Sequence, residues 1–246
     1  MCDTCGTPSD PVSRRRFLGS LPGGAAAAIA TLAALRGSRR FEEPGWTTTS
    51  TRALQLICKE AWRAGPPHGS FRRHHISRIT IHHSGVKLTD NRDAPGRFRA
   101  YQQEHQDLGW PDIAYHLLID RHGNVYKGRH MWAVGDTRTS YDPTGHLLVM
   151  CEGNMSEQDV SIRQMRGLVE VLTWATRHFD VPLRRIRGHR DFAATDCPGA
   201  NLYRRIEDGT IRHHVTRRRR EGGVSKRRLC GDAGSTRVRK IESGTD

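Results

Sequence analysis

Short runs of β-branched and apolar residues, separated by polar turns, mark the strands expected in the middle of this chain. Residues 78–84 (RITIHHS) are rich in such side chains and predict a buried strand. Residues 114–120 and 125–127 flank a polar turn at residues 121–124, which predicts a hairpin. Residues 147–150 predict a further short strand.

Two stretches repeat apolar residues at helical spacing instead. Residues 94–108 place Phe98, Tyr101, His105 and Leu108 on one helical face. A second helix is expected to begin at Ser156 and to end near Val181-Pro182. Its apolar stripe is Met165, Leu168, Val169, Leu172 and Phe179, the pattern of an amphipathic helix packed on a sheet. Strands therefore alternate with helices, which predicts an α/β domain.

The N-terminus is similar to an export signal. Residues 13–18 (SRRRFL) resemble the twin-arginine motif, and a mild apolar stretch follows at residues 21–35. That stretch is shorter than the roughly 20 residues that span a bilayer. A basic tail before an Ala-rich helix is the alternative. Residues 28–30 (AIA) form the one tidy cleavage pattern, and an uncleaved anchor stays open.

We therefore predict a twin-arginine signal peptide over residues 1–36 and a polar linker over residues 37–51. The domain is expected over residues 52–208. Residues 209–246 carry two Arg/Lys runs and few apolar residues, which predicts a basic disordered tail. Such a tail either binds an anionic polymer or has no specific partner.

The net charge of +14 raises the question of a nucleic-acid partner. Residues 53–208 hold 22 Lys/Arg and 18 Asp/Glu, whereas residues 209–246 hold 11 and four. The excess lies mainly outside the domain, so no specific nucleic-acid partner is predicted. The absence of a long apolar run excludes a polytopic membrane protein. Six cysteines in 246 residues are too sparse for a disulfide scaffold.

Three stretches carry candidate chemistry: residues 82–84 (HHS), residues 112–116 (DIAYH), and a late segment with GHRD at 188–191 and TDCP at 195–198. A catalytic zinc site needs three protein ligands and one open position. His189 and Cys197 lie eight residues apart on a Gly- and Pro-flanked loop that can fold back on one ion. Fourteen histidines also produce chance groupings, so these features alone leave the metal site open.

The ordered blocks ITIHHSG, LGWPDIAYHLLIDRHGNVYKGR and GHRDFAATDCPG resemble the type 2 N-acetylmuramoyl-L-alanine amidases, a family that includes the peptidoglycan recognition proteins and phage T7 lysozyme-like amidases. The resemblance covers residues 79–203. It implies a single α/β domain with a central mixed sheet flanked by helices on both faces.

The same resemblance implies a ligand set. His82, His189 and Cys197 match the three zinc ligands, with Cys197 bound as a thiolate. Tyr115 matches a tyrosine beside the metal, and Thr195 matches a position held by Lys or Thr in active members. Both are candidate catalytic residues. Imidazole and thiolate ligands favour Zn²⁺ over Mg²⁺ or Ca²⁺.

The neighbouring histidines need separate interpretations. Successive strand side chains face opposite sides, so His83 cannot bind the same metal as His82 and is expected to pack or hydrogen-bond. His116 is either a substrate contact or structural. Trp110 and Arg129 are further candidates for substrate contact. In place of the family's Gly-[Ala/Ser]-His element, this chain has Gly135 followed by Asp136 and Thr137.

The implied function is zinc-dependent hydrolysis of the amide between N-acetylmuramic acid and L-alanine in peptidoglycan, the expected partner. The alternative is a non-catalytic peptidoglycan-binding module of the same fold. The chain is expected outside the cytoplasmic membrane of a bacterium, at the cell wall, as a monomer without a transmembrane span in its mature form. There, Cys58 and Cys151 either form a disulfide or are two buried free thiols.

Overall fold

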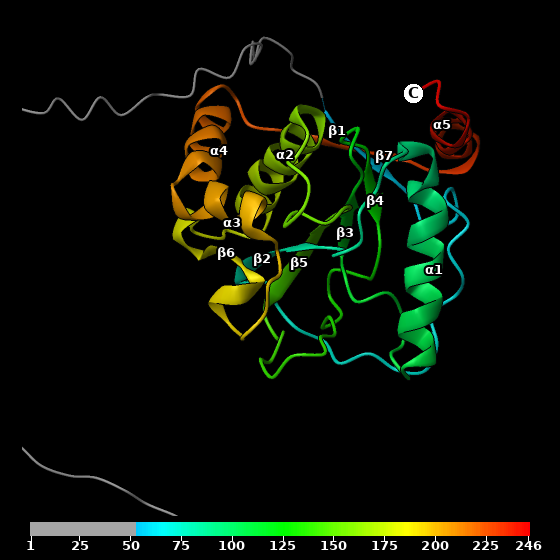
Figure 1. Cartoon of the computed structure of the whole chain (residues 1–246), viewed down its shortest axis with the longest axis horizontal. Coiled ribbons are helices and arrows are strands. Elements are labelled where there is room, and N and C mark those ends of the chain that lie inside the picture. Colours follow the sequence, from blue (N-terminus) through cyan, green and yellow to red (C-terminus); the bar gives the residue numbers. More distant parts are fainter. Residues whose placement is uncertain (1–52) are drawn as a thin grey trace, which may run out of the picture. The chain divides into compact units, whose positions relative to one another are not determined.

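A computed structural model describes residues 53–246, which build one mixed sheet in the order β6-β2-β5-β3-β4-β1-β7 (Figure 1). Every neighbouring pair is parallel except β3–β4, which is the expected hairpin. The strands are β1 (Leu54–Ile57), β2 (Arg78–His83), β3 (Leu117–Ile119), β4 (Val125–Lys127), β5 (His146–Cys151), β6 (Ile186–Gly188) and β7 (Lys226–Leu229). The mixed sheet agrees with the prediction.

Helices cover both faces of this sheet. Figure 1 shows α2, α3 and α4 on one side and α1 and α5 on the other. Their bounds are α1 (Ala94–Asp107), α2 (Ile162–His178), α3 (Ala200–Glu207), α4 (Thr210–Arg220) and α5 (Gly231–Ser243). All six residues of β5 are buried, because a central parallel strand has helices on each side and reads as a continuous apolar run. The predicted α/β architecture is confirmed.

The core on the α1 side is built from aromatic side chains. Trp62, Phe98 and Tyr126 are fully buried, and the ring of Phe98 contacts the other two edge-on at 6.5 and 4.9 Å. Such rings remove a large apolar area from water. They hold α1 against the strands that carry the candidate site.

Helix α2 begins later than the sequence predicts. Its N-cap is Ser161, whose hydroxyl accepts a hydrogen bond from the Gln164 N–H at 3.0 Å. The expected start at Ser156 is wrong, because Gln158 is engaged in the preceding loop. Its side-chain amide binds both the N–H and the carbonyl of Leu88 at 2.9 Å. The predicted strand at residues 114–120 is likewise reduced to β3.

The C-terminal segment is folded, and the predicted disordered tail over residues 209–246 is wrong. Strand β7 pairs in parallel with β1, from Leu54↔Lys226 to Ile57↔Leu229. The segment is poor in apolar residues, but those it has face the domain. The buried ones are Ile211 and Val215 in α4, Leu229 in β7, and Val238 and Ile241 in α5. Whether this segment folds therefore depends on where its apolar side chains lie rather than on how many it has.

A disulfide fastens this segment to the start of the domain. Cys58, directly after β1, is joined to Cys230, directly after β7, across 172 residues of sequence. Neither alternative for Cys58 and Cys151 is correct, because Cys58 has a different partner and Cys151 alone is a buried free thiol. The register of β1 and β7 explains the pairing, since their ends lie side by side.

The predicted signal at residues 1–36 and linker at residues 37–51 lie outside the described residues. Within residues 53–246, no helix is long and apolar enough to cross a membrane.

Candidate metal centre and cleft

Two neighbouring parallel strands bring His82 and His189 together. His82 lies near the end of β2, and His189 follows β6 directly as the first residue of the short helix η3 (His189–Asp191). Because Ile81 is paired with Gly188, the next residue of each strand lies at the same edge of the sheet. The two imidazole rings are 4.6 Å apart between centroids. Both side chains are buried.

The loop after η3 returns Cys197 to this edge. Its Sγ lies 3.5 Å from Nδ1 of His82 and accepts a hydrogen bond from the His83 N–H at 3.4 Å. One ligand atom each of His82, His189 and Cys197 lies within 4.8 Å of the others. The structure therefore brings together the three residues that the sequence predicts as ligands.

A hydroxyl group orients the second imidazole. Oγ1 of Thr139 lies 2.7 Å from Nε2 of His189. The hydroxyl oxygen of Thr137 lies 2.8 Å from that of Thr139. The contact with Thr139 leaves Nδ1 of His189 as the nitrogen available to a metal. Metal-binding histidines commonly donate their other ring N–H to such a partner, which determines the tautomer.

Burial sets the charge of the three groups. It lowers the pKa of His189 to about 4 and that of His82 well below its ordinary value, so both imidazoles are neutral at pH 7. Burial raises the pKa of Cys197 to about 12, opposed by the His83 N–H and by Arg190. Neutral imidazole is the form that binds metal, and a bound divalent cation deprotonates a coordinating thiol.

These donors suit zinc, which takes nitrogen and sulfur ligands in a site with one open position. They do not suit Mg²⁺ or Ca²⁺, which prefer oxygen. A second group, Cys58, Glu60 and Cys230, also lies close together. Its two sulfur atoms are joined to each other, so it is not available to a metal as a thiolate pair.

The three candidate ligands lie in the wall of an open cleft of about 370 Å³. Tyr115 and Thr195, the two candidate catalytic residues, also line it, and so does Trp110, a candidate substrate contact. The Tyr115 ring lies 5.3 Å from that of His82, and the Thr195 hydroxyl accepts the Cys197 N–H at 3.2 Å. Burial, and next the charge of Cys197, raise the pKa of Tyr115 above its ordinary value. Its hydroxyl is therefore a hydrogen-bond donor.

His116 is a structural residue rather than a substrate contact. It is fully buried and does not line the cleft. Its Nδ1 accepts the Leu148 N–H at 2.9 Å, and its Nε2 lies 2.9 Å from the Ala133 carbonyl. Burial lowers its pKa to about 3, so the ring stays neutral and links β5 to the loop after β4.

Arg129 also lies in the interior and not in the cleft wall, contrary to the predicted substrate contact. Its guanidinium donates to the backbone carbonyls of Ile113, Val134 and Asp112 at 2.9, 2.6 and 2.7 Å. It also pairs with Asp136 at 2.5 Å. Arg129 therefore holds the loop that carries Asp136 and Thr137 into the cleft wall.

His83 behaves as expected for the residue beside a ligand. Its Nδ1 accepts the Met155 N–H at 3.1 Å, and burial lowers its pKa to about 4. It lines the cleft but does not belong to the cluster of candidate ligands.

Sequence reasoning missed a buried carboxyl group next to the cleft. Glu152 is fully buried and accepts hydrogen bonds from Arg97 at 2.9 Å and from the Tyr101 hydroxyl at 3.1 Å. Burial raises its pKa to about 7. Tyr101 lines the cleft. The one available signal was an acidic residue directly after the apolar run at residues 147–151.

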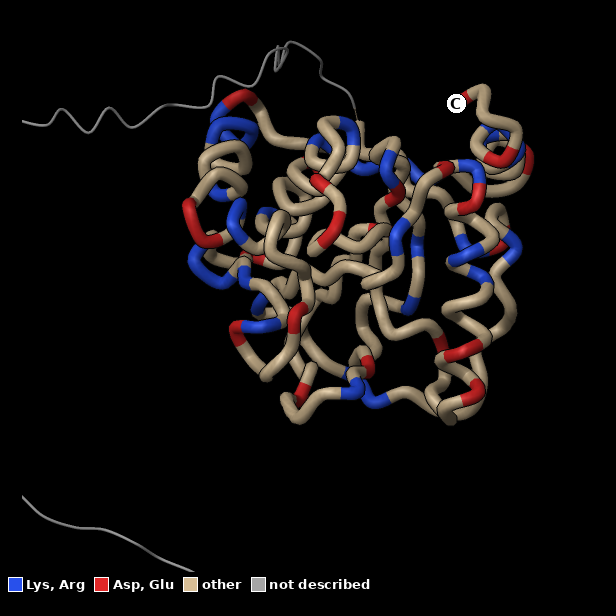
Figure 2. The backbone as a smooth tube through the Cα atoms, in the orientation of Figure 1, with Lys and Arg blue, Asp and Glu red and all other residues tan. Residues whose placement is uncertain are grey.

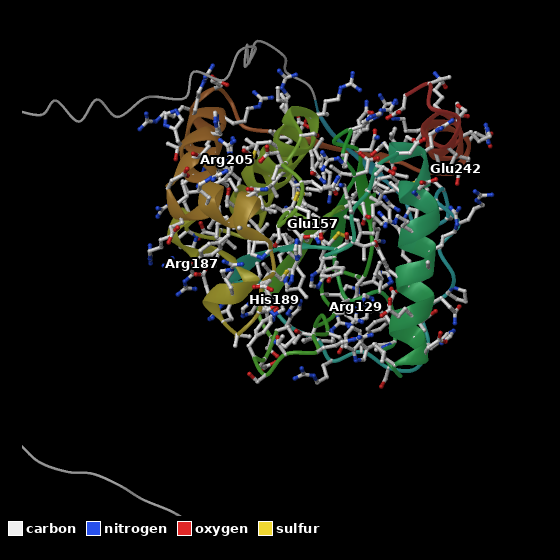
Figure 3. All side chains as sticks on the ribbon, viewed as in Figure 1. Arg129, Glu157, Arg187, His189, Arg205 and Glu242 are labelled. Carbon is white, nitrogen blue, oxygen red and sulfur yellow. A yellow bond between two sulfur atoms is a disulfide. The ribbon has the colours of Figure 1, made fainter. Side chains whose placement is uncertain are left out.

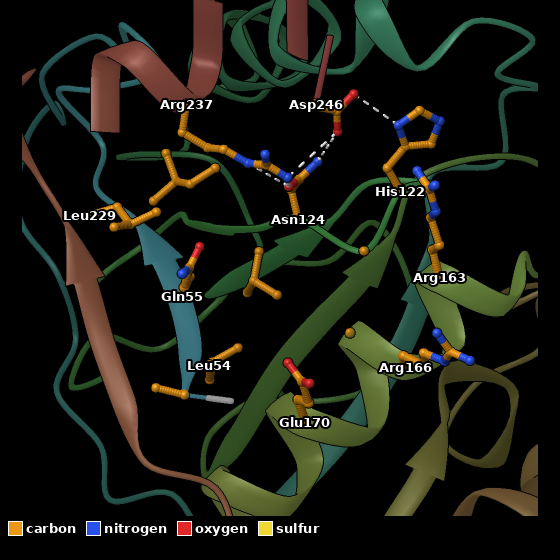
Figure 4. A pocket seen from close by; sticks show the side chains of 15 residues that line it. Leu54, Gln55, His122, Asn124, Arg163, Arg166, Glu170, Leu229, Arg237 and Asp246 are labelled. Atoms are coloured by element: carbon orange, nitrogen blue, oxygen red, sulfur yellow. Dashed lines mark hydrogen bonds and ion pairs between the residues drawn. The ribbon is translucent and has the colours of Figure 1, made fainter. Parts of the chain in front are cut away.

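A second cavity, of about 360 Å³, is lined by residues of β1 and of the hairpin turn (Figure 4). Figure 4 shows Arg237 against Asn124, and Asp246 between Asn124 and His122. Its arginines alternate with acidic groups, and it contains no cluster of metal-binding side chains. Among residues 53–246, the three candidate zinc ligands therefore lie in the first cleft.

The sequence and the fold match one family of proteins. A family model described as N-acetylmuramoyl-L-alanine amidase (Amidase_2) matches residues 72–200. The chain belongs to this family.

Its relatives include both recognition proteins and amidases. The chain is 31% identical to peptidoglycan recognition protein 1 of Mus musculus, over 64% of this chain and 89% of that protein. It is 32% identical to an endolysin of Enterobacteria phage K11, over 57% of this chain and 91% of that protein. The solved structure of Drosophila peptidoglycan recognition protein SD is similar, with a TM-score of 0.57 and 27% identity, over 62% of this chain and 92% of that one.

Proposed function

We propose that this chain is a zinc-dependent amidase that hydrolyses the bond between N-acetylmuramic acid and L-alanine in peptidoglycan. The observation that carries the proposal is the complete cluster of His82, His189 and Cys197 at an open cleft. A family member that only recognises peptidoglycan has no need for three metal-binding side chains within 4.8 Å of one another. The names of an amidase and an endolysin among the relatives support the same conclusion.

Zinc bound to these residues would supply a water of lowered pKa and polarise the scissile carbonyl. The chain's own groups do the rest. The Tyr115 hydroxyl lines the cleft beside His82 and donates to the oxygen that gains charge as the amide is attacked. Thr195 holds the Cys197 N–H and thereby positions the loop that carries the sulfur. Thr139 orients His189.

A non-catalytic peptidoglycan-binding module is the second candidate. Relatives named recognition proteins favour it, as does the loop at Gly135, where Asp136 and Thr137 replace the family's histidine element. The ion pair of Asp136 with Arg129 holds this carboxylate in place in the cleft wall. In this second candidate function, the cleft binds peptidoglycan without a histidine contact from this loop.

The test is digestion of purified peptidoglycan by the full chain, following the release of free L-alanine amino termini. We expect release that stops with a chelator and returns when zinc is restored. His189→Ala should lose both zinc and activity, while His68→Ala, which removes an exposed imidazole elsewhere, should lose neither. A folded, zinc-loaded chain that binds peptidoglycan without releasing amino termini would establish the binding module instead.

A further inference from the structure

A group of arginines lies at the edge of the sheet, outside the cleft. Arg78 at the start of β2, Arg184 and Arg185 in the short helix η2 (Leu183–Arg185), and Arg187 in β6 line one cavity of about 300 Å³ together with Phe192. No acidic residue lines it. Figure 2 shows Lys and Arg along this side of the molecule as well as elsewhere on it, and Figure 3 shows Arg187 directed outward from the edge strand.

The arginines are not neutralised by the protein. Within residues 53–246, no carboxylate forms an ion pair with any of the four. The Nε of Arg78 is inaccessible to water and has no hydrogen-bond partner among the described residues. The charge that the cavity presents to solvent comes from the exposed side chains of Arg184, Arg185 and Arg187. Arg185 donates to the Ser77 carbonyl at 3.3 Å, which anchors its side chain at the rim.

Charges on an edge strand also discourage pairing with other sheets, so arginine on β6 alone has an ordinary explanation. That explanation requires only Arg187. It does not account for a concave site that gathers Arg78 from the neighbouring strand and two arginines from η2. Like charges brought into one cavity repel each other unless an anion joins them.

We propose that this cavity binds phosphate groups of a polyol-phosphate polymer. A planar guanidinium group can donate two parallel hydrogen bonds to the oxygens of one phosphate. Four such groups in one cavity suit a polymer that carries consecutive phosphates. Bases would need a free aromatic face to stack on. One face of Phe192 is covered by Tyr141, which stacks on it at 5.6 Å, and His146 contacts the ring edge-on at 4.7 Å. A nucleic acid is therefore the less suitable polyanion.

The cavity is adjacent to the metal centre but separate from it. Phe192 follows η3, whose first residue is His189, and the Tyr141 ring lies between them at 5.2 Å from His189. The two sites share no lining residue. Binding at the arginines would hold the chain on a polymer while the cleft remains accessible.

The test measures binding of the full chain to fluorescently labelled poly(glycerol phosphate). Arg184→Gln/Arg187→Gln removes two exposed arginines without ion pairs, and we expect affinity to fall about 10- to 100-fold. The slope of log affinity against log salt should fall by about two. The matched control, Arg219→Gln/Arg220→Gln, loses the same charge from exposed positions in α4 and should stay within about twofold of the unmodified chain.

Equal weakening by both double variants would overturn the proposal, since diffuse charge would then explain binding. So would equal affinity for poly-L-glutamate, or tighter binding of oligothymidylate with the same number of phosphates. These measurements need no hydrolysis, so they are independent of the proposed activity. Both double variants should keep their zinc and should cleave a soluble muramyl peptide as the unmodified chain does.

Discussion

The hydroxyl of Thr139 lies 2.7 Å from Nε2 of His189 and holds that imidazole with Nδ1 directed away. Thr139 belongs to the loop that departs from the family's sequence pattern after Gly135. The same loop therefore carries the hydroxyl that orients one of the candidate ligands.

Thr139→Val should weaken zinc binding by about 10- to 100-fold, because the imidazole loses the partner that sets its tautomer and orientation. The measurement is competition with a chromophoric chelator. Ser140→Ala removes the hydroxyl of an exposed neighbouring residue and should leave zinc affinity unchanged. Unchanged affinity in Thr139→Val would show that the hydroxyl does not orient His189.

Tyr115→Phe should keep zinc and lower the turnover of peptidoglycan about 100- to 1,000-fold, because a donor to the developing oxyanion is lost. The value to follow is kcat alongside bound zinc, since a merely structural change would release metal or unfold the chain. Full turnover in this variant would exclude Tyr115 from catalysis. Tyr203→Phe, at a half-buried tyrosine whose hydroxyl donates to Asp191 at 2.7 Å, is the matched control.

Reduction of the disulfide, or Cys58→Ser/Cys230→Ser, should lower the free energy of unfolding by about 2–5 kcal/mol. The two cysteines are 172 residues apart in the sequence, so loss of the bond raises the conformational entropy of the unfolded chain. Denaturant titration measures the change. Cys151→Ala, at a buried thiol outside the bond, separates this effect from a general sensitivity to losing a cysteine.

Arg129→Met should destabilise the fold by about 3–5 kcal/mol, because it leaves buried carbonyls and Asp136 without their partner. Arg138→Met removes an exposed arginine paired with Glu104 and should cost less than about 1 kcal/mol. Similar midpoints of urea unfolding for the two variants would contradict the role assigned to Arg129.

Stability should fall as the pH rises from about 4.5 to about 7, because Glu152 keeps its proton in the folded chain after the unfolded chain has released its own. The contribution is fully present below pH 4.5 and is lost as the pH passes through about 7, a change of about 3 kcal/mol. Glu152→Gln should flatten this dependence. Glu157→Gln, an exposed neighbour, should not.

The predictable parts of the structure rest on local patterns. Helical spacing at Phe98 and Tyr101 gives α1 nearly to its ends, and the ordered motifs bring His82, His189 and Cys197 together. The predictions that failed concern residues whose surroundings come from parts of the chain that are distant in sequence. Val238 and Ile241 are too few to form a core of their own. In the folded chain they join the buried cluster that contains Trp62 and Phe98. Arg129 looks like a substrate contact until three carbonyls surround it.

The Cys58–Cys230 bond also determines how the chain bears mechanical load. A pull applied at residue 53 and at residue 246 is carried across the domain by this one covalent link. Strand β1 and helix α5 lie outside the link and can peel away first. All the cleft residues lie between the two cysteines in the sequence, in the segment that the disulfide bypasses. The metal centre therefore bears no pulling force for as long as the disulfide is intact.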